Sequence, residues 1–141
     1  MKKIMAIMAL ALCLTVSDVA AKSGRLSRPI LIYDKGELLQ IYMEDIKKYH
    51  GDICPCVMVS FRATRLAVSE LWKNEIPERS DFKIESSLPT DGSEDTFEFI
   101  TRAKKRNDFS LNFQKGGKKP NMSEKNYSFL FTRKSTREQV R

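Results

Sequence analysis

The sequence predicts an α+β fold in which one mostly antiparallel sheet carries helices on a single face. Two observations predict this class. Apolar residues recur at helical spacing in three segments, and in three other segments they alternate with polar residues, as in half-buried strands. The expected order along the chain is helix, helix, strand, helix, strand, strand, without an internal repeat.

The first two helices are expected in the N-terminal half. Residues 37–49 place their apolar side chains at spacings of three and four, which aligns them on one helix face. Gly51 follows, as glycine commonly does beyond a helix end. The second helix is expected to begin near Pro55, a residue suited to a first helical position, and to run to about Asn74, before Pro77.

The C-terminal half is expected to supply the strands and a third helix. Residues 82–86 alternate apolar and polar side chains and are expected to form a strand. The third helix is expected to start with Ser93 as its N-cap and to end near the basic residues 104–106. The other expected features are strands at 109–113 and 127–131, a loop at 115–126 and a short pairing segment at 136–141.

The N-terminus has the layout of a secretory signal peptide. Two lysines precede a mostly apolar run over residues 4–16, and short side chains at 19–21 suit a cleavage site. That run is too short to cross a membrane as a helix, so we expect cleavage and a periplasmic or secreted location. The expected organisation is a signal peptide over 1–21, an extended lead-in over 22–36 and one domain over 37–141.

The charge pattern excludes some partners. The chain has a formal net charge of +7, but its cations are spread out, with the densest groups at 104–106 and 118–119. A helix end and a solvated loop favour cations at those positions. Because no aromatic-basic motif accompanies them, we expect no nucleic-acid partner, and we expect no stable membrane insertion.

The only histidine and the two cysteines that follow the signal peptide lie together, at His50, Cys54 and Cys56. A disulfide between cysteines this close would be strained, so we expect a chemical role. Cys54 starts the second helix, where unpaired N–H groups and the helix dipole favour a thiolate. Thiolate and imidazole can bind zinc, act as nucleophile and base, or, with Cys56, exchange disulfides. The alternative is a purely structural role, in which His50 ends a helix and the two cysteines are small apolar side chains that fill space.

Residues 50–56, His-Gly-Asp-Ile-Cys-Pro-Cys, with Phe-Arg-Ala at 61–63, resemble a family signature. It is the His-Gly-His-x-Cys-Pro-Gly motif, with its following Tyr-Arg-Ala helix, of the formylmethanofuran dehydrogenase E-subunit family. The resemblance continues at 90–92 and 129–134 and covers 37–141. It implies an α+β fold related to the catalytic domain of glyceraldehyde-3-phosphate dehydrogenase, a metal, usually zinc, held partly by the first motif, and a homodimer.

The sequence departs from that family at the candidate metal site. Asp52 replaces the second histidine, Cys56 replaces a glycine, and Ser93 replaces the cysteine of the second motif. The C-terminal zinc ribbon of some members is not found in this sequence. The resemblance therefore carries over only His50 and Cys54 as ligands. Asp52 and Cys56 are our candidates to complete the site, because zinc normally has three or four protein ligands.

The leading hypothesis is a periplasmic domain that binds zinc, another divalent metal or a ligand at His50 and Cys54, in a binding role rather than as an enzyme. The alternatives are a thiol enzyme or redox protein that uses the same pair, and a degenerate subunit of an unknown protein partner. An exported protein cannot serve a cytoplasmic methanofuran complex, so the family name does not give the activity. A turn and a helix N-terminus explain the acidic residues Asp91, Glu94 and Asp95.

Overall fold

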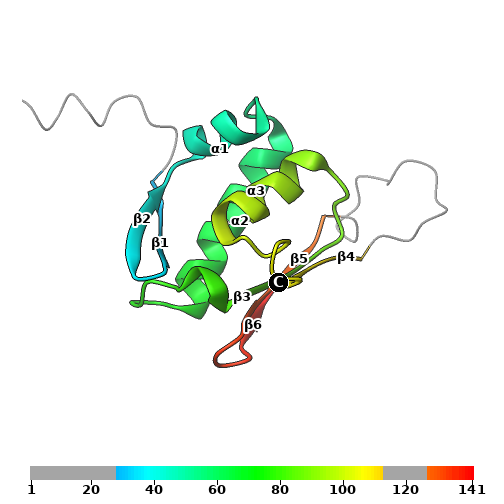
Figure 1. Ribbon diagram of the computed structural model, residues 1–141. Helices are drawn as coiled ribbons and strands as arrows, with labels where there is room; N and C mark the ends of the chain where they lie inside the picture. Colours follow the sequence, from blue (N-terminus) through cyan, green and yellow to red (C-terminus); the bar gives the residue numbers. More distant parts are fainter. Residues whose placement is uncertain (1–27, 113–126) are drawn as a thin grey trace, which may run out of the picture.

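The computed structural model describes residues 28–112 and 127–141, which form an α+β fold with three α-helices and two sheets (Figure 1). The helices are α1 (Met43–His50), α2 (Pro55–Leu71) and α3 (Asp91–Thr101), with a 3₁₀ turn at Arg79–Asp81. The strands are β1 (Ile30–Asp34), β2 (Glu37–Ile41), β3 (Phe82–Ser86), β4 (Phe109–Leu111), β5 (Phe129–Arg133) and β6 (Gln139–Val140). The expected class is confirmed, but the single, mostly antiparallel sheet is not. The proposed signal peptide lies outside the described residues.

The N-terminal part of the domain differs most from expectation. Residues 37–41 form β2, not the first turns of a helix, and pair with β1 as an antiparallel hairpin. Lys35 and Gly36 have φ of 56° and 86°, the two left-handed residues of a tight hairpin turn that matches the twist of the strands. The apolar residues at 38, 39 and 41 suit either a helix or a strand, and this turn favours the strand. The helix that remains, α1, begins only at Met43.

The larger sheet is mixed, with strand order β4-β3-β5-β6. β3 pairs antiparallel with β5, and β5 with β6, whereas β4 runs parallel to β3. The parallel pairing arises because the chain crosses from β3 to β4 through α3, and parallel neighbours need such a crossover. The strand expected at 82–86 is confirmed, and the segment at 136–141 does pair with its neighbour. Phe113 and the loop expected at 115–126 lie outside the described residues.

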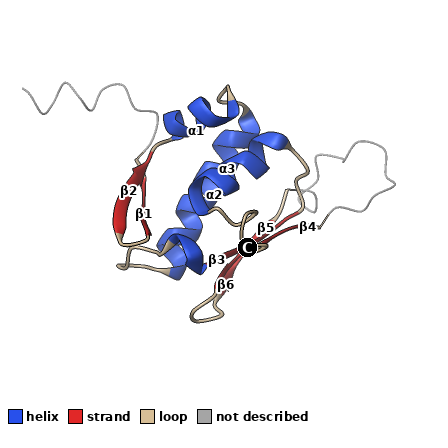
Figure 2. Cartoon of the chain, viewed as in Figure 1, coloured by secondary structure: helices blue, strands red, loops and turns tan. Residues whose placement is uncertain are grey.

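The core lies between the helices and the larger sheet. Figure 2 shows the β1–β2 hairpin on one side of the helices and the larger sheet on the other. Phe97 of α3 is fully buried, with ring centroids 5.2 Å from Phe129 and 5.7 Å from Phe131. Trp72 stacks on Phe82 at 4.4 Å. In the two described stretches, no helix is long and apolar enough to cross a membrane.

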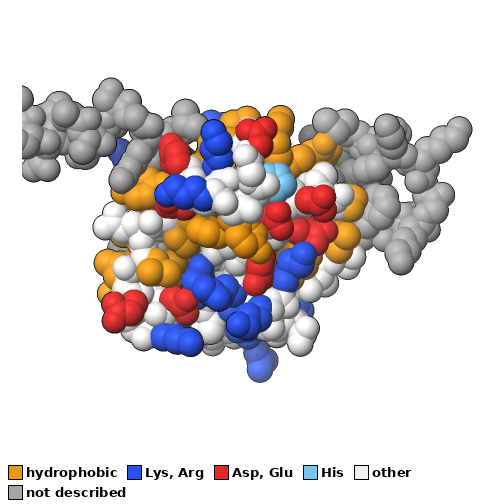
Figure 3. Space-filling model, turned by 45° about the horizontal axis from the view of Figure 1, so that its top comes forward, with side chains coloured by type: hydrophobic (Ala, Val, Ile, Leu, Met, Phe, Trp, Pro, Cys, Tyr) orange, Lys and Arg blue, Asp and Glu red, His pale blue; other side chains and the backbone are white. Residues whose placement is uncertain are grey.

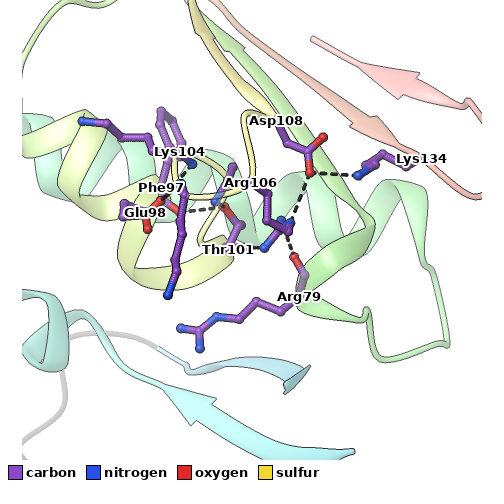
Figure 4. Close-up of polar contacts among 10 residues, drawn as sticks. Arg79, Phe97, Glu98, Thr101, Lys104, Arg106, Asp108 and Lys134 are labelled. Carbon is purple, nitrogen blue, oxygen red and sulfur yellow. Dashed lines mark hydrogen bonds and ion pairs between the residues drawn. The ribbon is translucent and has the colours of Figure 1, made fainter. Parts of the chain in front are cut away.

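Two arginines fix the C-terminal end of α3, which ends before the basic residues expected to close it. Arg106 donates to the carbonyl oxygen of Thr101 at 2.7 Å and to that of Arg79 at 2.8 Å (Figure 4). Arg79 is 7% exposed and donates to the carbonyl oxygens of Phe99 and Ile100. These bonds satisfy carbonyl groups that have no partner within the helix. They also hold α3 in place, and α3 contributes to the candidate site.

Candidate functional site

The turn between α1 and α2 brings His50 and Cys54 together. His50 is the last residue of α1, and Cys54 is the N-cap of α2. Gly51 between them has a φ of 104°, which non-glycine residues rarely adopt, and its N–H donates to the Lys47 carbonyl at 2.7 Å. The chain therefore reverses sharply, and the Nε2 atom of His50 lies 3.9 Å from the Sγ atom of Cys54.

A third side chain extends this pair. The Nδ1 atom of His50 lies 2.8 Å from the Oδ2 atom of Asp95 on α3, although the two residues are 45 positions apart in sequence. If Nδ1 carries the proton and donates it to this carboxylate, Nε2 is left facing the sulfur. The hydrogen bond that His50 donates to Asp95 is the main cause that raises the pKa of His50 above its usual value, and the Cys54 side chain adds to it, against partial burial.

Cys54 lies in surroundings that favour its thiolate. Partial burial opposes ionisation of the thiol, but the nearby backbone N–H groups of Val57 and Cys56 and the His50 side chain favour the thiolate and outweigh it. The pKa of Cys54 is therefore lower than the ordinary value. These N–H groups belong to the first turn of α2, where no carbonyl is available to accept them and the helix dipole is positive. Pro55 at the first helical position fits this start.

Gly92 of α3 provides the space that the sulfur occupies. A Cβ atom at this position would lie 2.7 Å from the Sγ atom of Cys54, and 3.3 Å from the nearest side-chain atoms of Cys56 and Val57. Any residue with a side chain would force the thiol or the helix to move. The thiol is thus held between the first turn of its own helix and the first turn of α3.

The other two proposed metal ligands do not join the pair. Asp52 is exposed, and its Oδ1 atom accepts a hydrogen bond from the Ile53 N–H at 2.7 Å. Cys56 is a partly buried free thiol packed against the core. Within residues 28–112 and 127–141, no three His, Cys, Asp or Glu side chains form a group that could hold a metal ion.

Ser93, expected as the N-cap of α3, has another role. The N-cap is Thr90, whose side chain accepts from the Ser93 N–H. Ser93 itself is fully buried, and its Oγ atom accepts hydrogen bonds from Ser60 at 2.9 Å and from Thr90 at 3.0 Å. Its hydroxyl therefore joins α2 to α3.

Asp95 and Gly92 are the site residues that the sequence does not reveal. The sequence pattern explains Asp95 as an acid near a helix N-terminus, and Gly92 as part of a turn. No local pattern connects either residue with the His50–Cys54 segment, because the connection is a packing contact between α3 and the α1–α2 turn. Besides the family resemblance at 90–92, which includes Gly92, the available signal is their spacing of three along α3, which puts both on one helix face.

The site can be reached from solvent. The side chain of His50 is 18% exposed and that of Asp95 is 34% exposed. Figure 3 shows the single histidine, in pale blue, at the surface with acidic side chains close by. A thiol, an imidazole and a carboxylate connected in this order form the arrangement of a nucleophile, its base and the group that orients the base.

Comparison with family models, with curated proteins and with solved structures finds no match to this chain.

Proposed function

We propose that the protein is a thiol-dependent acyl-transfer enzyme or hydrolase, in which Cys54 is the nucleophile, His50 the acid–base group and Asp95 its orienting partner. One observation supports this proposal: the His50 imidazole lies between the other two groups. Its Nε2 atom is 3.9 Å from the Cys54 sulfur, and its Nδ1 atom is 2.8 Å from the Asp95 carboxylate. Cysteine nucleophiles are activated by such a base, and contacts in a site without substrate are often looser than a short hydrogen bond.

The proposed reaction has two halves, and in each of them the Nε2 atom of His50 transfers a proton. The Cys54 thiolate attacks the carbonyl carbon of the substrate, a C–S bond forms, and the carbonyl π electrons move to oxygen. When the intermediate collapses, the bond to the leaving group breaks, and the His50 imidazolium protonates that group from Nε2. A water molecule then gives a proton to the same nitrogen and attacks the thioester; the C–S bond breaks, the acid is released, and the Cys54 thiolate and the His50 imidazolium are restored.

Asp95 favours this enzyme over a disulfide-exchanging protein. Disulfide exchange needs a reactive thiolate, but it does not need an imidazole held in one orientation. The contact between Asp95 and His50 fixes the ring and stabilises the imidazolium that forms in each half of the reaction. A degenerate site without activity would not need an oriented imidazole.

A divalent metal held by His50 and Cys54 is the second candidate. Their atoms lie 3.9 Å apart, a separation that one zinc ion bound to both can bridge, given bond lengths of about 2.0–2.1 Å to nitrogen and 2.3 Å to sulfur. Asp95 would then orient the liganding imidazole from behind, as carboxylates commonly do in zinc sites. The resemblance of residues 50–56 to the metal-binding motif of the formylmethanofuran dehydrogenase E-subunit family favours this candidate. It ranks second because the described residues supply only two ligands.

Site-resolved alkylation tests the two candidates together. The purified protein is treated with iodoacetamide near neutral pH, before and after chelation, and modification of Cys54 is followed by mass spectrometry. The metal content is measured on the same sample. Cys56, a free cysteine two residues away, is the internal control, because it has no histidine partner among the described residues.

The outcomes separate the candidates. Fast alkylation of metal-free protein at Cys54, slowed in His50→Ala to the rate of Cys56, supports the thiol enzyme. Alkylation that becomes fast only after chelation, with bound metal lost in both His50→Ala and Cys54→Ala, supports the metal site instead. Slow alkylation of a metal-free protein under both conditions would refute both candidates.

A further inference from the structure

We propose that the thiol site acts on an extended peptide whose apolar side chain, about three residues from the reacting carbonyl, binds a pocket between β2, α1 and α3. This inference rests on the proposed thiol chemistry and adds the class of substrate. It follows from three features of the described residues: one face of α3, an apolar pocket, and the free edge of β2.

One face of α3 links the thiol to the pocket. Gly92, Asp95 and Phe99 are spaced by three and four positions, so they follow one another along the same face of the helix. Gly92 lies against the Cys54 sulfur and Asp95 binds His50. Phe99 contacts the Tyr49 ring at 5.5 Å between centroids. At 1.5 Å per residue, the step from Gly92 to Phe99 is about 10 Å.

The far end of this face lines a pocket of about 420 Å³. Tyr49 and Phe99 form part of its wall, and Tyr49 is 54% exposed, so a ligand in the pocket could contact its ring. The volume lies within the range of small-molecule binding pockets, and the walls are mostly apolar. In Figure 3 a band of hydrophobic side chains lies on the same face of the molecule as the histidine. The pocket therefore suits an aromatic or large aliphatic group.

The edge of β2 indicates that this group belongs to a peptide. Leu39, Gln40 and Ile41 are consecutive residues of β2, and all three line the pocket. Successive side chains of a strand point to opposite faces, so a pocket that touches all three runs along the strand edge. Within the described residues, β2 pairs only with β1 and leaves its other edge without a strand. An extended peptide can pair with such an edge and place a side chain in the adjacent pocket.

The distance sets the length of the substrate. An extended peptide advances about 3.3–3.6 Å per residue, so about three residues span the 10 Å between the pocket and the thiol. An apolar side chain bound in the pocket, against Tyr49 and Phe99, thus places the carbonyl three residues away at Cys54. Shorter substrates cannot reach both places at once.

Two thiol-reactive peptides test this prediction on the purified protein. Acetyl-Phe-Ala-Ala chloromethyl ketone carries the aromatic group at the required distance, and acetyl-Ala-Ala-Ala chloromethyl ketone is its matched control. Alkylation of Cys54 by each is timed by mass spectrometry, in the wild type and in Tyr49→Ala. Leu66→Ala is the control variant, because Leu66 is 59% exposed on α2 and does not line this pocket. Iodoacetamide, which needs no pocket, reports the thiol alone.

We expect the Phe peptide to react at least roughly tenfold faster than the Ala peptide, because a side chain that fills an apolar pocket gives a rate advantage of this size. This ratio should fall toward one in Tyr49→Ala and persist in Leu66→Ala. Equal rates for both peptides, in protein that iodoacetamide alkylates quickly, would refute the pocket and leave the thiol function standing.

Slow iodoacetamide alkylation would refute the thiol function, and the pocket is then judged by binding. Ligand-observed NMR with acetyl-Phe-Ala-Ala amide should show binding that Tyr49→Ala abolishes. The absence of binding to the wild type would refute the pocket as well.

Discussion

Gly92→Ala is expected to disturb the site through a single steric contact. The new Cβ atom would lie 2.7 Å from the Cys54 sulfur. Non-bonded heavy atoms are most stable about 3.5–4.0 Å apart, so the overlap is about 1 Å. Overpacking of this kind costs about 1–3 kcal/mol, whereas alanine in place of a helical glycine stabilises by at most about 1 kcal/mol. We therefore expect a net destabilisation of about 0.5–2 kcal/mol, although Ala normally stabilises a helix.

A double-mutant cycle isolates this contact. Urea unfolding gives the free energy of unfolding for wild type, Gly92→Ala, Cys54→Ala and the double variant. Without the sulfur, the remaining contacts of the new methyl group are at 3.3 Å, and its cost should largely disappear. We expect a coupling energy of about 1–2 kcal/mol. Gly92→Ala should also slow alkylation of Cys54, because the displaced sulfur moves relative to His50.

The opposite result would refute the geometry of the site. If Gly92→Ala stabilises the protein equally with and without the Cys54 sulfur, the thiol does not lie against α3. The spatial order from Gly92 to Phe99, on which the peptide site depends, would then also be wrong.

Asp95→Asn should lower the pKa of His50 toward its usual value and raise that of Cys54, because the imidazolium loses its carboxylate partner. The pH profile of Cys54 alkylation, which we expect to have its midpoint below 9.0 in the wild type, should move upward; an unchanged midpoint would exclude a role for Asp95. Arg79→Ala should destabilise the protein by about 3 kcal/mol in urea unfolding, because it leaves buried carbonyl groups at the end of α3 without donors. A loss under about 1 kcal/mol would show that water replaces the guanidinium. Phe97→Ala should cost about 3–5 kcal/mol by the same measurement, since its fully buried ring fills the core between α3 and the larger sheet. A small loss would mean that the core closes over the cavity.

The elements that the sequence predicted well are those with strong local signals. The start of α2 at Pro55 and the alternating strand β3 are set by the residues they contain. The failure at 37–41 has a physical cause as well. A short segment with apolar residues at 38, 39 and 41 satisfies both periodicities, and its pairing with β1 is a contact that periodicity does not encode.

The sequence by itself determined one half of the candidate site. His50 and Cys54 are close in the chain, and Gly51 and Pro55 impose the turn and the helix start that bring imidazole and thiol together. Only the tertiary structure decided the other half. Asp95 reaches His50 because α3 packs across the α1–α2 turn.

The same packing decides which side chains surround the imidazole and the thiol. The sequence left a metal ligand pair, a thiol nucleophile and a decayed site as alternatives. Contacts from α3 make Asp95 the partner of the imidazole, while Asp52 and Cys56 stay outside the group. The physical reason is that local sequence determines only which side chains of the same turn lie close together. The side chains that meet them from another helix are fixed by the core that holds the helices together.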